Sequence, residues 1–246
     1  MEQLYLFSAG SANDELYKNL WIKGASLFIP QINKLIDYTN YYFEIIDIEY
    51  FKNDNSDKLG YIFFKNGSDK STSHNYHILY SYILKKLDKN INILEIGLGT
   101  NDPKLISTMG ENGKPGASLY SFLEYLPNSN IYGADIDKNI LFQSEKIKTC
   151  YIDQLELETF NNVSNNFGNI KFDLIIDDGL HSIGANLNTL IYSIENLNKN
   201  GWIVIEDIHI KDNWKSIDFI LNSTNKFKTF FIKDNDKYLF VLNKLI

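Results

Sequence analysis

The chain has 246 residues, of which 44% are hydrophobic and 22% charged, and its formal net charge is −7. The acidic balance argues against a protein whose main partner is a nucleic-acid backbone, and the single cysteine, Cys150, excludes an internal disulfide. The first residues carry no basic segment leading into an apolar run, and no stretch is apolar for long enough to span a bilayer. We therefore expect a cytoplasmic protein with no membrane partner.

The N-terminal third of the chain gives mixed signals. Residues 28–38 have the spacing of an amphipathic helix, whereas residues 41–50 are aromatic and β-branched and could form either a strand or a helix. Residues 71–73 can cap a helix that runs through residues 77–84. We predict that residues 1–88 form an N-terminal extension that packs on the following domain or covers its site as a lid.

From residue 91 onward, apolar strands alternate with helices, which predicts a parallel sheet with right-handed crossovers. Two closing strands joined by a tight turn predict an antiparallel edge strand. The predicted fold class is therefore α/β, with a Rossmann-like, doubly wound, mostly parallel seven-stranded sheet over residues 89–246. The expected strands cover residues 91–96, 130–136, 149–153, 172–176, 202–205, 227–232 and 237–242, and the expected helices cover residues 118–126, 141–148, 185–197 and 214–221.

The first strand of this domain ends in Glu95 and the glycine pair Gly97 and Gly99. Glycines at the carboxyl end of a buried strand let the backbone approach a ligand closely. The dinucleotide fingerprint needs a third glycine, but Asp102 stands at that position, where a pyrophosphate would meet a like charge. S-adenosylmethionine carries a positive sulfonium and no phosphate, so it suits this acidic turn better than NAD does.

Each of the first five strands ends in a carboxylate, and parallel strands bring these ends to one edge of the sheet. Acids at strand ends can simply cap the following helices, but five at one edge favour a binding site. Asp135 can accept hydrogen bonds from ribose hydroxyls, and Asp153 with Gln154 could meet an adenine amino group. The predicted cofactor-binding residues are Glu95, Gly97, Gly99, Asp135, Ile136, Asp153, Gln154 and Asp177.

A second group of acids follows the fourth and fifth strands. Asp178, Glu206 and Asp207 would form a hard oxygen site for Mg²⁺ or a similar divalent cation. His181 lies one helical turn from Asp178 and is the predicted general base for a hydroxyl whose pKa the cation lowers. The alternative for His181 is a histidine that caps a helix. His74, in the extension, could line the same pocket or be an ordinary helix histidine.

Four motifs carry a family resemblance: residues 95–99 (EIGLG), 132–137 (YGADID), 177–181 (DDGLH) and 205–207 (IED). With them the chain resembles class I S-adenosylmethionine-dependent methyltransferases and, more narrowly, the metal-dependent sugar O-methyltransferases of the macrocin and mycinamicin type. The resemblance runs from about residue 68 to the C-terminus. It implies that Asp178, Glu206 and Asp207 bind Mg²⁺ and that His181 is the base. Leu180 departs from the family, where a small polar residue is usual, and this puts substrate contacts in question.

The implied activity is S-adenosylmethionine-dependent, Mg²⁺-dependent O-methylation of a sugar hydroxyl, on a nucleotide-activated or surface-polysaccharide sugar. One alternative is an NAD-dependent nucleotide-sugar oxidoreductase or epimerase, which the missing third glycine disfavours. Another is a non-catalytic methyltransferase-fold binding subunit, which the intact acidic motifs disfavour. The expected partner is a small-molecule sugar, with no nucleic acid, and the aromatic residues of the extension weakly favour a homo-oligomer.

Overall fold

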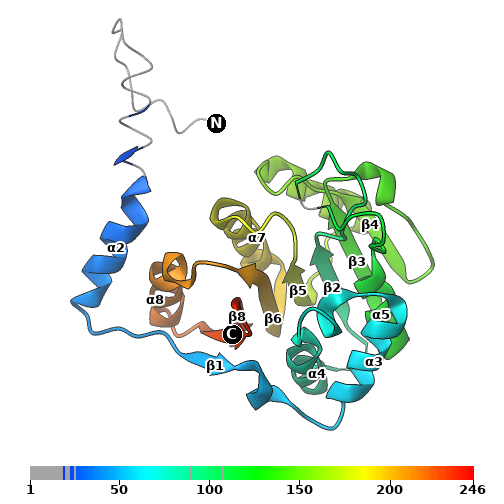
Figure 1. Cartoon of the computed structure of the whole chain (residues 1–246), viewed down its shortest axis with the longest axis horizontal. Helices are drawn as coiled ribbons and strands as arrows, with labels where there is room; N and C mark the ends of the chain where they lie inside the picture. The colour runs from blue at the N-terminus through cyan, green and yellow to red at the C-terminus, as the bar shows by residue number, and fades with distance from the viewer. Residues whose placement is uncertain (1–18, 20–22, 25, 89, 107) are drawn as a thin grey trace, which may run out of the picture.

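The computed structural model contains an eight-stranded sheet between two layers of helices (Figure 1). It describes residues 19, 23–24, 26–88, 90–106 and 108–246, so residues 1–18, 20–22 and 25 of the predicted extension lie outside the described residues. The strands are β1 (Ile45–Asp47), β2 (Asn92–Ile96), β3 (Asn130–Asp135), β4 (Ile147–Tyr151), β5 (Phe172–Asp177), β6 (Leu197–Ile208), β7 (Phe227–Asp234) and β8 (Lys237–Lys244).

The strand order is β1-β7-β8-β6-β5-β2-β3-β4. Strand β8 is antiparallel to both β6 and β7, whereas the other pairs are parallel. The carboxyl ends of β2, β3, β4, β5 and β6 therefore lie at one edge of the sheet, which is where ligands bind in open α/β folds.

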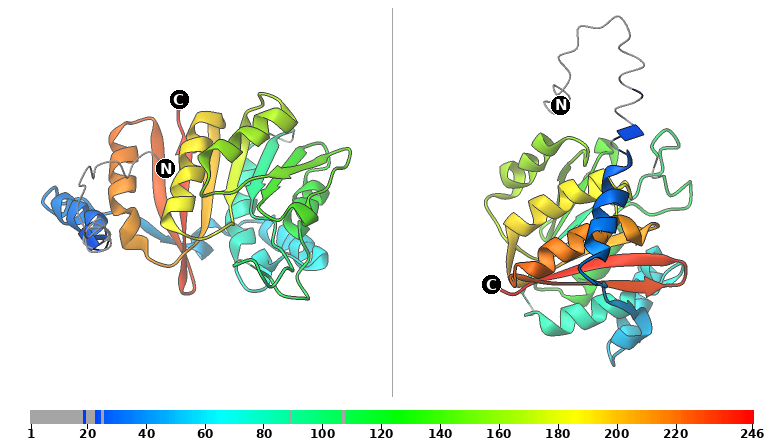
Figure 2. Two further views of the ribbon diagram at one scale, coloured as in Figure 1. Left: turned by 90° about the horizontal axis from the view of Figure 1, so that it is seen from above. Right: turned by 90° about the vertical axis from the view of Figure 1, so that its left-hand side faces the viewer.

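Helices cover both faces of the sheet (Figure 2). The helices α3 (Ser56–Asn66), α4 (Tyr76–Lys86) and α5 (Ala117–Tyr125) lie on one face, and α6 (Asn161–Phe167), α7 (Ile183–Asn196) and α8 (Lys215–Ser223) lie on the other. Helix α2 (Phe28–Asp37) lies at the margin, against α8. Short 3-10 turns are η1 (Ile48–Phe51), η2 (Asp69–Ser71), η3 (Lys138–Ile140), η4 (Leu157–Phe160) and η5 (Lys211–Trp214).

The central strands are apolar on both sides because each side packs against a helical layer. On β2, Ile93 belongs to the core beneath α3, α4 and α5, and Leu94 belongs to the opposite core. On β5, Leu174 and Ile176 face the first core, whereas Ile175 faces the second. Strands buried on both faces read as continuous apolar runs, as the sequence pattern indicated.

The predicted fold class is confirmed, and all seven expected strands are present. The antiparallel strand does not occupy the edge position expected for it. Strand β8 turns back from β7 after Asp234, but its free side pairs with β6, so β7 lies beyond it. Residues 45–47, which the sequence left undecided between strand and helix, form β1 and extend the sheet past β7.

The helix predicted over residues 141–148 is wrong. Strand β4 begins at Ile147, and the segment before it is fixed to β4 by side-chain hydrogen bonds. The hydroxyl of Thr149 accepts from the N–H of Phe142 at 2.6 Å and donates to its carbonyl at 2.7 Å, and Gln143 donates to the carbonyl of Thr149 at 2.6 Å. Such local bonds give the backbone an alternative to a helix.

The division into an extension and a domain stays a prediction. The described part of the extension supplies β1 to the sheet and α3 and α4 to its cover, so its side chains share the main core. Phe63 and Tyr80 from this segment contact Phe122 of α5 edge to face. None of the described helices is both long enough and apolar enough to cross a membrane.

Candidate active site

Two pockets open side by side at the carboxyl edge of the sheet, and both are lined by Gly97, Gly99 and Asp178. We call them the apolar pocket and the polar pocket after their remaining residues. The apolar pocket is lined mainly by Ile96, Leu105, Ile106, Asp135, Ile136, Ile152, Leu155 and Leu180. The polar pocket is lined mainly by Ser68, Asp69, Lys70, Ser73, Glu95, Lys114, Ser118, His181 and Asp207.

Gly97 lines both pockets and stands at a position that only glycine fits. Its φ is +92°, in the left-handed region, and a Cβ would lie 2.1 Å from the carbonyl oxygen of Asp178. The N–H of Asp178 donates to the carbonyl of Ile96 at 2.8 Å. The turn after β2 is therefore packed directly on the loop after β5, which carries the acidic motif.

Asp135 lies at the end of β3 and lines the apolar pocket, as predicted. Its two oxygens accept the N–H groups of Leu98 at 2.7 Å and Asp137 at 2.8 Å. Burial raises the pKa of the Asp135 carboxyl. A carboxylate has about four acceptor positions, so a ligand hydroxyl can still bind here. Ile136, beside it, is 46% exposed and forms part of the pocket wall.

Gln154 and Asp177 serve the loop after β5. The amide of Gln154 donates to Asp177 at 2.8 Å and to Thr189 at 2.8 Å, and its oxygen accepts the N–H of Leu180 at 2.8 Å. Asp177 is fully buried and also accepts from Asn186 of α7 at 3.0 Å. Both groups are engaged within the protein, but Gln154 also lines the apolar pocket, so the cofactor contacts of Gln154 and Asp177 stay predictions.

Asp153 has a similar local task. Its carboxylate accepts the N–H of Leu155 at 2.9 Å and so stabilises the turn after β4. Among the described residues, Ile152, Gln154 and Leu155 line the apolar pocket, but Asp153 is not in that set. The adenine contact assigned to Asp153 stays a prediction that the pocket lining does not support.

Lys70 is the unexpected centre of the polar pocket. It comes from η2 and is 1% exposed. Its Nζ lies 2.7 Å from Asp178, 2.7 Å from Glu206 and 3.2 Å from Glu95. Burial would lower the pKa of Lys70, but the charges of the three carboxylates outweigh it and raise that pKa well above its usual value.

Glu206 is held away from the pocket by two partners. Its Oε2 faces Lys70, and its Oε1 accepts a hydrogen bond from the hydroxyl of Tyr80 on α4. Burial and the nearby charge of Asp178 raise the pKa of Glu206 well above its usual value, against the opposing charge of Lys70. The predicted metal ligand Glu206 is therefore bound internally by a cation and a hydroxyl.

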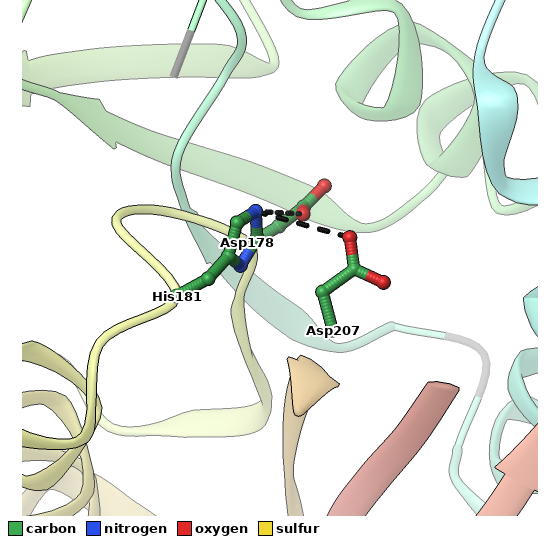
Figure 3. Close-up of side chains that lie close together, drawn as sticks. All are labelled: Asp178, His181 and Asp207. Atoms are coloured by element: carbon green, nitrogen blue, oxygen red, sulfur yellow. Dashed lines mark ion pairs between the residues drawn. The ribbon is translucent and has the colours of Figure 1, made fainter. Parts of the chain in front are cut away.

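Asp178, His181 and Asp207 form a compact group (Figure 3). One ligand atom from each residue lies within 4.8 Å of the others. The Nε2 of His181 is 3.9 Å from Oδ1 of Asp178 and 3.8 Å from Oδ2 of Asp207. Ligand atoms about 2.1 Å from a magnesium ion lie roughly 3 to 4 Å apart, so a divalent cation held by Asp178 and Asp207 would draw this group slightly closer together.

The backbone at two of these residues is left-handed. His181 and Asp207 both have φ of +53°. Aspartate and histidine adopt this region several-fold more often than most other residues, so the geometry restricts which residues can stand at these two positions.

Neighbouring groups lower the pKa of the Asp207 carboxyl. The hydroxyl of Tyr76 donates to it at 2.6 Å, and Nε2 of His74 lies 3.9 Å away. Burial opposes the charge, but the hydrogen bond from Tyr76 and the charges of His181, His74 and Lys237 lower the pKa of Asp207. His74 therefore lies near the site, whereas an ordinary helix histidine was the more expected of its two interpretations.

The structure brings together two of the three predicted metal ligands, Asp178 and Asp207, with the predicted base His181. Sequence reasoning missed Lys70, Tyr76 and Tyr80. The two tyrosines stand four residues apart on α4, a spacing that puts them on one helix face and could have indicated a shared target. Lys70 gave no such signal, because a lysine in a polar turn is normally exposed.

No protein-family model matches the sequence. The chain is 28% identical over 146 residues to 8-demethyl-8-alpha-L-rhamnosyl tetracenomycin-C 2'-O-methyltransferase of Streptomyces olivaceus, covering 58% of this chain and 36% of that protein. It is 34% identical over 121 residues to L-olivosyl-oleandolide 3-O-methyltransferase of Streptomyces antibioticus, covering 49% of this chain and 28% of that protein. The chain spans about a third of the length of these curated relatives.

Among solved structures, the fold is similar to that of MycE methyltransferase from the mycinamycin biosynthetic pathway, determined in complex with Mg and SAH. The TM-score is 0.50 at 24% identity, over 63% of this chain and 37% of that chain. The resemblance seen in the motifs is confirmed: the chain has the fold of class I S-adenosylmethionine-dependent methyltransferases, and its sequence is similar to those of sugar O-methyltransferases.

Proposed function

We propose that the protein transfers the methyl group of S-adenosylmethionine to a sugar hydroxyl, with Mg²⁺ or a similar divalent cation. The observation that carries this proposal is the pair of pockets that share Gly97, Gly99 and Asp178. A donor in one pocket and an acceptor in the other would meet at that shared wall. The named reactions of the relatives, all O-methylations of glycosylated compounds, support the same chemistry.

The apolar pocket suits the donor. Ile136, Ile152 and Leu155 offer apolar surface to a flat adenine ring, and Asp135 offers acceptor oxygens to ribose hydroxyls. Gly97 and Gly99 form part of the wall that the apolar pocket shares with the polar pocket. The acidic surroundings favour a sulfonium over a pyrophosphate.

The polar pocket suits the acceptor. Asp178 and Asp207 would hold the divalent cation, which when bound lowers the pKa of a hydroxyl that it contacts. His181 would orient that hydroxyl and take its proton at Nε2, which faces the two carboxylates. Holding oxygen and methyl group in line is worth ~7–11 kcal/mol at best.

The lining of the polar pocket supports a hydroxyl-rich acceptor. Ser68, Ser73 and Ser118 can exchange hydrogen bonds with sugar hydroxyls, and Lys114 can face an anionic group. We favour a nucleotide-activated sugar or a sugar of a surface polysaccharide. The net charge of −7 disfavours a nucleic-acid acceptor. A cytoplasmic location and a homo-oligomer remain predictions.

The proposal is tested by turnover on a panel of nucleotide sugars and polysaccharide fragments, followed by mass spectrometry. Chelator should abolish methyl transfer and Mg²⁺ should restore it, whereas full activity in excess chelator would remove the cation from the reaction. His181→Ala should lower kcat about 10²–10⁴-fold, because a general base contributes that much. Its S-adenosylhomocysteine affinity, measured by calorimetry, should stay within about threefold.

His209→Ala provides a matched control, because His209 is also near the end of β6 but exposed. Its kcat should equal that of the wild type. Wild-type turnover in His181→Ala would move the base elsewhere. Binding of NAD in place of S-adenosylmethionine would favour an oxidoreductase or epimerase, and cofactor binding without turnover on any sugar would favour a binding subunit.

A further inference from the structure

A buried ammonium stands where several site carboxylates converge. Nζ of Lys70 lies within 3.2 Å of oxygens from Glu95 on β2, Asp178 after β5 and Glu206 on β6. A charge taken out of water must be paired and hydrogen-bonded, and this one is paired three times. Two of these acids, Asp178 and Glu206, were expected to bind a divalent cation, so two cations compete for their oxygens.

The carboxylate oxygens of Asp178, Glu206 and Asp207 have different partners. Asp178 turns Oδ2 to Lys70 and Oδ1 towards His181, so it bridges the two sides of the pocket. Glu206 gives Oε2 to Lys70 and Oε1 to Tyr80, so each of its oxygens already has a partner outside the pair of Asp178 and Asp207. Asp207 has one oxygen on Tyr76 and the other towards His181.

We infer that Lys70 is a fixed resident cation that keeps Glu206 and Glu95 out of the coordination shell of the divalent cation. The inference rests on the cation of the proposed function. Lys70 takes Glu95, Glu206 and one oxygen of Asp178, and the divalent cation takes only Asp178 and Asp207 among these carboxylates. Lys70 is thus a positioning residue, which acts through Asp178.

Glu206 stays with Lys70 because turning to the divalent cation would cost free energy. If Glu206 turned to the divalent cation, Lys70 would lose a partner 2.7 Å away and the buried hydroxyl of Tyr80 would lose its acceptor. Breaking a buried ion pair is strongly unfavourable, because it leaves an uncompensated charge. Keeping Glu206 on Lys70 leaves coordination positions of the divalent cation for water and acceptor oxygens, as magnesium prefers.

Two neighbouring acids provide a direct test. Glu206→Gln and Asp207→Asn each remove one charge and keep the side-chain shape. Binding of Mn²⁺, which accepts the same oxygen ligands as Mg²⁺, can be followed by the loss of the free-ion signal in electron paramagnetic resonance. Asp207→Asn should weaken Mn²⁺ binding at least tenfold, whereas Glu206→Gln should stay within about threefold of the wild type.

The thermal stability of lysine variants provides the second arm. In chelator, Lys70→Met should lower Tm by about 10 °C, because it leaves the buried carboxylates of Glu95 and Glu206 and the partly exposed one of Asp178 without their cation. Lys65→Met is the matched control, since Lys65 makes a 2.8 Å pair with Glu124 but is 52% exposed, and its Tm should not change measurably. Added Mg²⁺ should raise the Tm of Lys70→Met more than that of the wild type, since the released acids become ligands. A merely structural lysine would give no such rescue.

The outcomes separate the inference from the proposed function. Equal losses of Mn²⁺ affinity in Glu206→Gln and Asp207→Asn overturn the division of the carboxylates and leave the metal role standing. A wild-type protein that binds Mn²⁺ no better than Asp207→Asn overturns both. The predicted pattern in a protein that methylates no sugar supports the division and contradicts only the proposed acceptor. If Lys70→Met does not fold, the Mn²⁺ affinities of Glu206→Gln and Asp207→Asn alone test the inference.

Discussion

The apolar and polar pockets share one wall but are built from different parts of the chain. The apolar pocket takes its lining from residues 96–155 and the turn at residues 178–180, all within the alternating strand–helix region. The polar pocket also needs η2, and its acids are held by tyrosines of α4. One pocket follows from local pattern, and the other depends on contacts between distant segments.

The two pockets also differ in how charge is handled. In the apolar pocket, backbone N–H groups bind the carboxylate of Asp135. In the polar pocket, a buried ammonium and two tyrosine hydroxyls bind the carboxylates of Glu206 and Asp207. Backbone donors are present wherever a strand ends, whereas an ammonium must be brought by a specific side chain. The polar pocket is therefore the more sensitive to single substitutions.

The largest effect should come from the wall that both pockets share. Gly97→Ala would force a Cβ to 2.1 Å from the carbonyl oxygen of Asp178 at a φ of +92°. We expect the free energy of unfolding to fall by about 3 kcal/mol or more and S-adenosylhomocysteine affinity to fall about 100-fold. Denaturant unfolding and calorimetry measure the two effects.

The control for this change is Gly184→Ala. Gly184 is exposed in α7, and a Cβ there would meet nothing within 4 Å. Alanine is the better helix former, so this variant should gain about 0.5–1 kcal/mol. Normal affinity in Gly97→Ala would mean that the shared wall does not join the pockets.

The pH dependence of stability sharpens the contrast in charge. The pKa of Glu206 is raised in the folded protein, mainly by burial, above a value of about 4.3 in the unfolded chain. As pH rises through 4.3, the unfolded chain ionises first, so the folded state loses stability. Relative to Glu206→Gln, the wild type should therefore lose stability as pH rises above about 4.3, until the folded pKa is reached and the ionised carboxylate pairs with Lys70.

Urea unfolding in chelator from pH 4 to pH 8 measures this difference. Glu124→Gln is the control of opposite sign, because the hydrogen bond from Lys65 lowers the pKa of Glu124. Parallel stability curves for the wild type and Glu206→Gln would contradict the raised pKa.

A smaller effect should distinguish the two pockets, because each of two variants should weaken the binding of only one ligand. Asp135→Asn should weaken S-adenosylhomocysteine binding at least tenfold, because a hydrogen bond to a charged group is worth about 1.5–3 kcal/mol. It should leave Mn²⁺ binding unchanged, whereas Asp207→Asn should do the reverse. Calorimetry and Mn²⁺ titration of both variants suffice. A loss of both affinities in either variant would show that the pockets act as one site.

The sequence predicted the fold well because its central strands are buried on both faces. Apolar runs that end in acids located the core strands and the ligand-binding edge, including Gly97, Gly99 and Asp135. It failed between β3 and β4, where the apolar residues suggested a helix but hydrogen bonds from Thr149 fix an irregular segment. Local side-chain bonds of this kind leave no trace in hydrophobic periodicity.

The charged cluster could be predicted only in part. Asp178, His181 and Asp207 follow strands that are neighbours in the sheet, so their proximity follows from topology. Lys70 reaches Asp178 across 108 sequence positions and Glu206 across 136. Nothing in a short polar turn indicates that its lysine is buried, because the burial is imposed by α4 and the sheet together. The contact between Lys70 and Glu206 holds the Glu206 side chain away from the other predicted metal ligands, and the sequence does not indicate that contact.

The left-handed backbone at residues 181 and 207 limits how this site can drift over evolutionary time. A replacement there must suit the chain geometry as well as the chemistry, and only glycine, asparagine, aspartate and histidine adopt that geometry readily. A descendant freed from selection for the reaction would therefore accept Gly or Asn at these two positions long before Val or Ile. Such a lineage would carry a recognisable mark of lost activity while its fold remained intact.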